Sequence, residues 1–488
     1  MSQLGQFIAC ILVVGILTCS SLSAQLTISD PISVTQGDNS FGKKSPKLAL
    51  NANGELMVFW MRTGNEAFFI STLEAGFFST PNQILFGGIN PNLWSGSLGP
   101  NMASTGDNVY VTFEVYGDAI YVVHSADGGQ SWGNPVAAFI PPQGRRATIP
   151  TIAVDTEGHP YIVYVNTNAS EGDAHYGMVR SNDFGLTFTD EVDVSENADG
   201  DEVCECCNGH IEIAPNGDVY VAFRNNNANL RDIWLARSTD DGASFSSAFD
   251  VDETDWISGV CPSNGPHFTM TEDQIVTTFF SGTGSGGSGV YYSTYDIDLS
   301  AVGPTIDLPL SNIDFENQNR PRIHGNNETL AMVWQENTDN GVDIAMSVST
   351  SGPEGLTAEP FILASLASTQ QFPSVIFDGE RFHVVYEDNE TGTLLYQEVI
   401  VGAVGLNTEE VLSFEIQPNP SSDVITITRE SSKPAEMHIV DLQGKIMLSE
   451  TIADKRSLID ISYLRPGIYS VTIIEQGRSS FQRLQVLK

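Results

Sequence analysis

The segments SADGGQSW (residues 125–132), SNDFGLTF (181–188) and STDDGASF (238–245) decide how this chain folds. All three follow the pattern Ser-x-Asp-x-Gly-x-Ser/Thr-aromatic, and they begin 56 and 57 residues apart. In this pattern the carboxylate of Asp127, Asp183 or Asp240 caps backbone amides of a tight turn, the glycine adopts positive φ, and the aromatic ring fixes the turn to a strand. A repeat of this length is typical of propellers and solenoids. We therefore predict repeated β-units, with a structural rather than a catalytic role for the three aspartates.

A second, longer pattern occurs seven times. Each copy has a Pro or Gly, one variable residue, an apolar strand, a turn, and a strand that ends in an aromatic residue. The copies begin 50 to 59 residues apart, at Pro46, Pro100, Pro150, Gly209, Pro266, Pro321 and Pro373. Their second strands end in predicted core residues, which are Trp60, Phe113, Tyr164, Phe223, Phe279, Trp334 and Tyr386. Four-stranded units of this length are propeller blades. We predict an all-β fold: a seven-bladed β-propeller over residues 26–402, with six blades as the alternative.

The two ends of this region are expected to meet. The last copy has only three strands and stops at residues 393–400, whereas residues 26–35 form an orphan strand that resembles the fourth strand of other copies. Pairing these segments would close the ring and remove its free edges.

The rim of the central channel is the predicted site. The first strand of each blade lines the channel, so the variable residue of each copy recurs around one rim. These residues are Lys47, Asn101, Thr151, His210, His267, Arg322 and Ser374. Four of them can carry positive charge on a body, residues 1–410, that has only 13 Lys and Arg against 52 Asp and Glu. This clustering predicts an anionic ligand with a carboxylate, sulfate or phosphate group; a hydrated channel without a ligand is the alternative. An outer ring of the same funnel would comprise Arg62, Glu114, Arg224, Glu336 and Glu387.

Four cysteines are expected in the mature chain: Cys204, Cys206, Cys207 and Cys261. Cys204 and Cys261 each precede a rim histidine by six residues, which places their loops on the same face. In an exported protein a disulfide between these loops is the first expectation, and a vicinal bridge between Cys206 and Cys207 is a further one. A Zn or Cu site built from the cysteines with His210 and His267 is the alternative. The acidic loops 195–202 and 250–255 are candidates for Ca²⁺ or for a solvated surface.

The two ends of the chain differ from the middle. Residues 7–17 are uncharged and apolar and precede small residues, which predicts a signal peptide over residues 1–24. After a linker at 403–412, residues 413–488 contain short predicted strands typical of a small β-sandwich. The motifs QPNPSSD (417–423), VDLQGK (440–445) and LRPGIY (464–469) resemble the C-terminal sorting domain of the type IX secretion system. This resemblance implies export by that machinery to the surface or surroundings of a Bacteroidetes-type bacterium.

The three turns are Asp-boxes (BNR repeats), and with the blades they resemble the sialidase superfamily. That family implies an arginine clamp for a carboxylate, here Arg224, Arg322 and Arg62, but its early Arg-Ile-Pro signature is absent and no nucleophile can be assigned. A seven-bladed scaffold with His and Arg also resembles uronate-polysaccharide lyases, in which His210 or His267 would move protons. Candidate catalytic residues are thus His210, His267, Arg322 and Arg224, and candidate ligand-binding residues add Lys47, Asn101 and Arg62. The function we predict is recognition, with or without processing, of an anionic glycan; a non-enzymatic adhesin or a metal-binding propeller are alternatives.

Charge limits the partners of the chain. A formal net charge of -39 argues against nucleic acid and anionic membranes as partners. No segment after the signal peptide is long and apolar enough to span a membrane. We expect a monomer.

Overall fold

The computed structural model describes residues 26–35, 42–63, 67–92, 98–115, 119–200, 202–282, 288–309, 318–339, 341–364, 366, 368–402, 413–429, 431–441, 445–475 and 478–487. The predicted signal peptide and the linker at 403–412 lie outside these residues. The regular structure of the described residues is strands and a short 3-10 helix at Pro353–Thr357, joined by turns and loops. The all-β prediction is confirmed.

Seven antiparallel sheets form from the described residues before position 402. The first has β3 (Lys43–Leu50), β4 (Leu56–Arg62), β5 (Ala67–Glu74), β6 (Phe77–Phe78) and β7 (Asn82–Ile84). The second has β8 (Asn101–Thr105), β9 (Asn108–Val115), β10 (Ala119–Ser125) and β11 (Val136–Phe139). The third has β12 (Arg145–Val154), β13 (Pro160–Asn168), β14 (His175–Arg180) and β15 (Val192–Asp193). The fourth has β16 (His210–Ile213), β17 (Val219–Arg224), β18 (Ile233–Ser238) and β19 (Ser247–Asp250).

The remaining three sheets follow the same order. The fifth has β20 (His267–Met270), β21 (Gln274–Gly282), β22 (Ser288–Asp296), β23 (Ala301–Val302) and β24 (Ile306–Asp307). The sixth has β25 (Gln318–Gly325), β26 (Leu330–Thr338), β27 (Gly341–Ser349) and β28 (Phe361–Ala364). The seventh has β29 (Gln370–Phe377), β30 (Arg381–Asp388) and β31 (Thr393–Val401), to which β1 (Leu26–Ile28) and β2 (Ile32–Ser33) are added.

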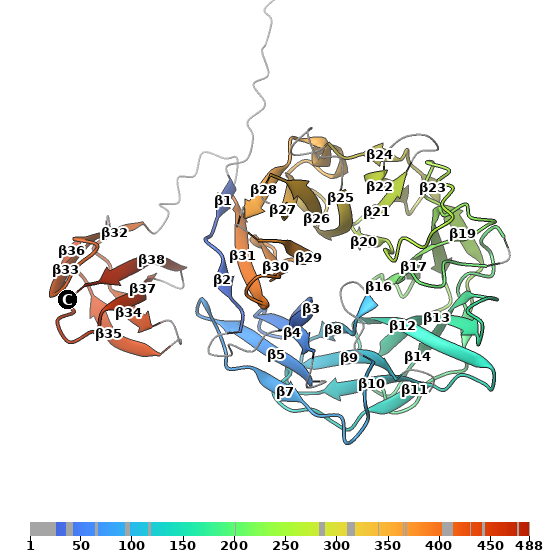
Figure 1. The fold of residues 1–488 in the computed structure, drawn as a ribbon, viewed down its shortest axis with the longest axis horizontal. Coiled ribbons are helices and arrows are strands. Elements are labelled where there is room, and N and C mark those ends of the chain that lie inside the picture. Colours follow the sequence, from blue (N-terminus) through green and yellow to red (C-terminus); the bar gives the residue numbers. More distant parts are fainter. Residues whose placement is uncertain are drawn as a thin grey trace, which may run out of the picture.

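These sheets are arranged in a ring with the first strand of each at the centre (Figure 1). Each first strand contacts the first strand of the next sheet, from β3 through β8, β12, β16, β20 and β25 to β29, and β29 contacts β3. Seven apolar clusters lie between successive pairs of sheets, including one between the seventh sheet and the first. The seven aromatic residues predicted for the core are all fully buried. The second strands are rich in apolar residues because the two neighbouring sheets cover both of their faces.

The orphan strand pairs where the sequence predicted. Leu26 to Ile28 of β1 lie antiparallel to Val401 to Val399 of β31, and Ile32 of β2 is opposite Tyr396. The ends of this region therefore share one sheet.

Four of the first strands contain a bulge just before their proline. The pairing register shifts there in β3, β12, β25 and β29, and the residue before the proline has a φ between 53° and 57°. The amides of three of these residues, Ser45, Ile149 and Phe372, bond to side chains of the preceding sheet, whereas the Arg320 amide bonds to Asn319 of its own strand. Ser45 N–H donates to Glu387 Oε1 at 2.7 Å, and Ile149 N–H donates to Glu114 Oε2 at 2.7 Å. The two buried glutamates therefore join adjacent sheets.

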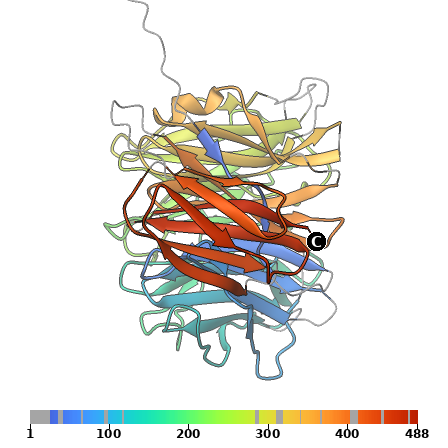
Figure 2. The same cartoon turned by 90° about the vertical axis from the view of Figure 1, so that its left-hand side faces the viewer.

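The last part of the chain has a core of its own. One sheet contains β32 (Phe414–Gln417), β33 (Val424–Arg429) and β36 (Arg456–Asp460). The other contains β35 (Ile446–Ile452), β34 (Ala435–Asp441), β37 (Gly467–Glu475) and β38 (Arg478–Val486). This unit faces the viewer in Figure 2, and apolar residues of both sheets form its interior. It is the small β-sandwich that the sequence predicted.

Candidate functional site

A cavity of about 470 Å³ occupies the centre of the ring. Its wall includes six of the seven predicted rim residues, namely Lys47, Asn101, His210, His267, Arg322 and Ser374. Thr151 is not in the wall; it lies buried in β12, just before the lining residues Ile152 to Val154. The structure thus gathers from six sheets the residues that the repeat had aligned.

Three further ionisable residues line the cavity that sequence reasoning had missed: Glu212, Arg320 and His324. Glu212 lies two residues after His210, and Arg320 and His324 lie two residues on either side of Arg322. Alternate residues of a strand point to the same side. Extending the rim by this period of two would have identified Glu212 and His324, whereas Arg320 lies in the bulge of β25, where the alternation is interrupted.

The histidines of the cavity are packed against one another. The rings of His210 and His267 stack with centroids 3.8 Å apart, and His210 Nε2 lies 3.3 Å from Glu212 Oε1. Burial, with the charge of His210, holds the pKa of His267 well below its usual value, and burial also lowers the pKa of His324. Nδ1 of His267 is buried and has no hydrogen-bond partner among the described residues. His267 is therefore a neutral ring at pH 7, which corrects the expectation that it adds positive charge.

Lys47 and Arg322 are cations of the cavity wall whose charged forms are destabilised by the surrounding protein. Burial, reinforced by Arg322 and partly offset by Glu387, lowers the pKa of Lys47 from 10.5 to about 7. Burial and then Arg320 lower the pKa of Arg322 to about 10. Arg322 Nη1 donates to the Pro321 carbonyl oxygen at 2.7 Å. In the described part of the chain neither Lys47 nor Arg322 forms an ion pair. Both cations thus lose hydration without forming an ion pair, and only Lys47 is partly compensated, by Glu387.

Arg224 does not belong to this site. It is fully buried, and its Nε donates to the Asn264 carbonyl at 3.2 Å, its Nη1 to the Arg231 carbonyl at 2.6 Å, and its Nη2 to the Phe280 carbonyl. Its guanidinium also lies 5.4 Å from the Trp256 ring centroid. All three nitrogens are occupied by the fourth and fifth sheets. The predicted roles of Arg224 in catalysis and in a carboxylate clamp are wrong because this guanidinium holds backbone instead.

The outer ring of the funnel is also corrected. Glu114 and Glu387 join neighbouring sheets, as described above, and Glu387 also accepts a hydrogen bond from Lys44 Nζ at 2.8 Å. Glu336 is fully buried and accepts the Trp334 Nε1–H at 2.9 Å. Arg62 lies over the Phe69 ring, 4.8 Å from its centroid, and is not in the cavity wall. These residues stabilise contacts between strands and sheets.

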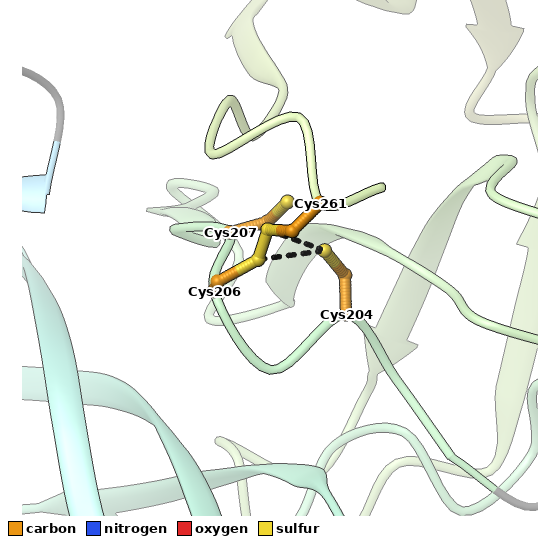
Figure 3. A group of neighbouring side chains, drawn as sticks. All are labelled: Cys204, Cys206, Cys207 and Cys261. Carbon is orange, nitrogen blue, oxygen red and sulfur yellow. Dashed lines mark hydrogen bonds between the residues drawn. A yellow bond between two sulfur atoms is a disulfide. The ribbon is translucent and has the colours of Figure 1, made fainter. Parts of the chain in front are cut away.

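The cysteines gather in one cluster, and a disulfide joins the two loops as expected, but the vicinal bridge is not formed (Figure 3). Cys206 and Cys261 form a disulfide between the loops that precede β16 and β20, while Cys204 and Cys207 are buried free thiols. Burial raises the pKa of the Cys204 thiol, but the bond from Cys207 and the charges of Arg224 and Arg231 outweigh it, so the net shift is downward. Burial and the neighbouring Cys204 raise the pKa of Cys207 well above its usual value. Cys206 thus bonds to Cys261 and not to its neighbour Cys207.

The three aspartate turns have one geometry. In each, the serine hydroxyl donates to the aspartate at 2.7 Å, and the amide four residues after the aspartate donates to it at 2.8 or 2.9 Å. The glycines have φ of 75° to 85°. Hydrogen bonds of this kind lower the pKa of Asp183 and Asp240 to about 2. The turns connect third to fourth strands, away from the cavity, which supports their structural role.

The acidic loops give no calcium site in the described part of the chain. Burial raises the pKa of Asp232 to about 7 and that of Asp250 to about 6, with the neighbouring Asp252 contributing to both. Of the described residues, the one group of three or more with ligand atoms close enough to share an ion is the four cysteines.

Comparisons with known proteins identify the end of the chain. Residues 415–487 match the family described as a secretion system C-terminal sorting domain. No curated protein matches the chain. A protein of unknown function from Dyadobacter fermentans is 14% identical, with a TM-score of 0.46, over 77% of this chain and 99% of that one. A GH93 α-L-arabinofuranosidase of Fusarium graminearum is 11% identical, with a TM-score of 0.44, over 77% and 98%. A PL25 ulvan lyase is 12% identical, with a TM-score of 0.42, over 81% and 93%.

The sorting domain establishes where the protein works. Its presence confirms the predicted localisation, because this domain marks proteins that are secreted or held at the cell surface in Bacteroidetes. No helix in the described ranges is both long enough and apolar enough to cross a bilayer. The chain is a cargo of the type IX secretion machinery.

Proposed function

We propose that residues 26–402 form a seven-bladed propeller of the sialidase-like type that binds an anionic glycan in its central cavity. Residues 1–24 would be the signal peptide, and residues 413–488, after the linker, the sorting domain. The seven sheets, their closed sequence of contacts and the three aspartate turns support the propeller assignment.

The observation that carries the proposed function is the state of Lys47 and Arg322. Both line the same cavity, and for both the pKa is lowered by burial and by another cation. A carboxylate or sulfate bound between them would supply the missing counter-charge and form charge-assisted hydrogen bonds. Asn101 and Ser374 add neutral donors and acceptors suited to sugar hydroxyl groups.

A second candidate function is proton abstraction from the bound sugar. His267 is neutral and lines the cavity together with Arg322. A neutral imidazole can accept a proton, while Arg322 would neutralise the carboxylate of a uronate. Glu212 is the only carboxylate among the described residues of the wall, and no tyrosine lines it. Neither paired-carboxylate hydrolysis nor the sialidase tyrosine mechanism therefore has its residues here.

Calorimetric titration of the mature protein with sulfated and uronate-containing oligosaccharides tests the binding proposal. We expect binding at pH 6 that weakens as the pH rises through about 7, because Lys47 then loses its proton. Arg322→Gln should weaken binding at least tenfold, since a charge-assisted bidentate contact contributes roughly 1.5–3 kcal/mol.

Two controls sharpen this titration. Lys47→Arg keeps its charge at every pH tested and should flatten the pH profile, whereas Arg180→Gln removes a cation that pairs with Asp241, outside the cavity wall, and should bind normally. Equal binding of a neutral oligosaccharide of the same length, or unchanged binding by Arg322→Gln, would refute the proposal and favour a scaffold or adhesin.

A further inference from the structure

The four cysteine sulfurs form one compact cluster, in which Cys206 and Cys261 are joined by the disulfide. Cys204 Sγ is 3.8 Å from Cys206 Sγ and 4.0 Å from Cys261 Sγ, and all four sulfurs lie within 4.8 Å of one another (Figure 3). A tetrahedral zinc ion with Zn–S bonds of about 2.3 Å holds its sulfurs about 3.8 Å apart. The two distances that involve Cys204 thus have the span of a tetrathiolate site.

Nitrogen donors surround the cluster. Arg231 Nη1 donates to Cys204 Sγ at 3.3 Å, and the Ser263 amide donates to Cys261 Sγ at 3.4 Å. Arg231 is itself held by the Ser258 carbonyl, which accepts from its Nε at 3.1 Å. N–H groups that point at sulfur favour the thiolate over the thiol, and such outer-shell bonds orient metal ligands.

The charge around the cluster fits a metal with four thiolates. A divalent ion with four thiolates has a net charge of -2, which needs compensation inside a protein. Two buried arginines lie beside the sulfurs. Arg231 is 5% exposed and contacts Cys204, and Arg224 is fully buried, with its carbonyl accepting the Cys204 amide at 3.0 Å. Carboxylates also lie near these arginines: Glu205 is 3.9 Å from Arg231, and Asp252 interacts electrostatically with Arg224. An anionic cluster would add to this compensation, with the Arg231 guanidinium in direct contact with Cys204.

We propose that Cys204, Cys206, Cys207 and Cys261 together bind one thiophilic d10 metal ion, Zn²⁺, when all four are reduced. Binding exchanges protons for metal: four thiols and one Zn²⁺ give the tetrathiolate and release four protons, with no redox change. The Cys206–Cys261 disulfide is the metal-free oxidised form of the same sulfurs. A dithiol reductant converts that form by transferring two electrons and two protons and becoming a cyclic disulfide itself.

The rim histidines are not ligands of this ion. The rings of His210 and His267 stack on each other in the cavity, and the group with converging ligand atoms contains cysteines alone. The metal would instead hold together the loops that precede β16 and β20. Cys204 in the first loop and Cys261 in the second each lie six residues before the rim histidine that begins the strand. This position makes the cluster a support for the fourth and fifth sheets at the channel.

Metal and thiol analysis of the full mature chain tests the inference. The protein would be reduced with a dithiol, supplied with Zn²⁺ without oxygen, freed of excess metal, and examined for zinc content and thiol reactivity. We expect one zinc per chain and four thiols that react only after chelation or unfolding. Replacement by Co²⁺ should give the thiolate charge-transfer and visible bands of a tetrahedral site. A zinc content below one ion per several chains, together with thiols that react without chelation, would overturn the inference.

Two variants keep the test independent of folding. Cys207→Ser leaves the Cys206–Cys261 pair free to form its bridge, so the chain can fold, but zinc affinity should fall at least tenfold. His210→Ala should keep full zinc content. Unchanged zinc binding by Cys207→Ser, or loss of zinc in His210→Ala with the fold intact by circular dichroism, contradicts a four-sulfur site.

Discussion

Replacing Lys47 by methionine should make the protein more stable in a way that depends on pH. The pKa of Lys47 is lowered from 10.5 to about 7 in the folded chain, so between these values the unfolded chain binds more protons and stability rises with pH. At about 1.36 kcal/mol per pKa unit, the desolvated ammonium costs about 5 kcal/mol well below pH 7, about 4 kcal/mol at pH 7, and about 1.5 kcal/mol near pH 9.5. The groups that face it are Arg322, His267 and Glu387.

Urea unfolding without ligand measures this cost. All six tryptophans lie between residues 60 and 334, so their fluorescence reports on the ring and not on the sorting domain. We expect Lys47→Met to unfold at higher urea than the wild type at pH 7, and the gap to shrink by about 3 kcal/mol near pH 9.5. Lys44→Met is the matched control, because Lys44 is paired with Glu387 at 2.8 Å and its loss should lower stability. A gap between wild type and Lys47→Met that is the same at both pH values would refute the reasoning.

Two further substitutions separate supporting residues from the site. Arg224→Met should lower the free energy of unfolding by roughly 3–5 kcal/mol, because three buried carbonyls lose their donor; a loss under about 1 kcal/mol by urea titration would show that the guanidinium contributes little there. Asp183→Ala should slightly lower the melting temperature, since its turn loses three accepted bonds, and should leave the affinity for anionic oligosaccharides unchanged; a loss of affinity would place this turn at the ligand.

The sequence predicted those features that recur at the same position of every copy of the repeat. A residue that follows a proline at the same point of successive copies faces the same way in each, so the repeat alone was enough to assign Lys47 and Arg322 to one channel, whose wall they share. The position of a residue in the repeat does not predict which atoms it contacts in the neighbouring sheet. Glu114 and Glu387 follow core aromatics in the same way as Arg224, yet the glutamates accept amides of the next sheet and the arginine donates to carbonyls. The choice depends on which atoms the neighbouring sheet presents.

Protonation was the other limit of sequence reasoning. A histidine on a cationic rim suggests charge, but the ring of His210 stacked on His267 and the surrounding cations leave His267 neutral. The cysteines show the same limit. Their loops could be placed on one face from their equal distance to the rim histidines, but which sulfur meets Cys261 depends on the path of the loop at 204–207.

The seam between the two ends of the ring bears on how the protein withstands pulling. If the sorting domain is exchanged for a surface anchor, a force that pulls on the ring acts at Val401, the last residue of β31. That strand has a neighbour on each side, with β30 bonded to residues 393–400 and β1 to Val401, Ile400 and Val399. Force along its axis loads these antiparallel ladders in shear, so many hydrogen bonds must break together rather than one after another. The attachment point is therefore an interior strand of its sheet. Because β1 is bonded to β31 on the side opposite β30, β31 is not an edge strand that could be peeled away.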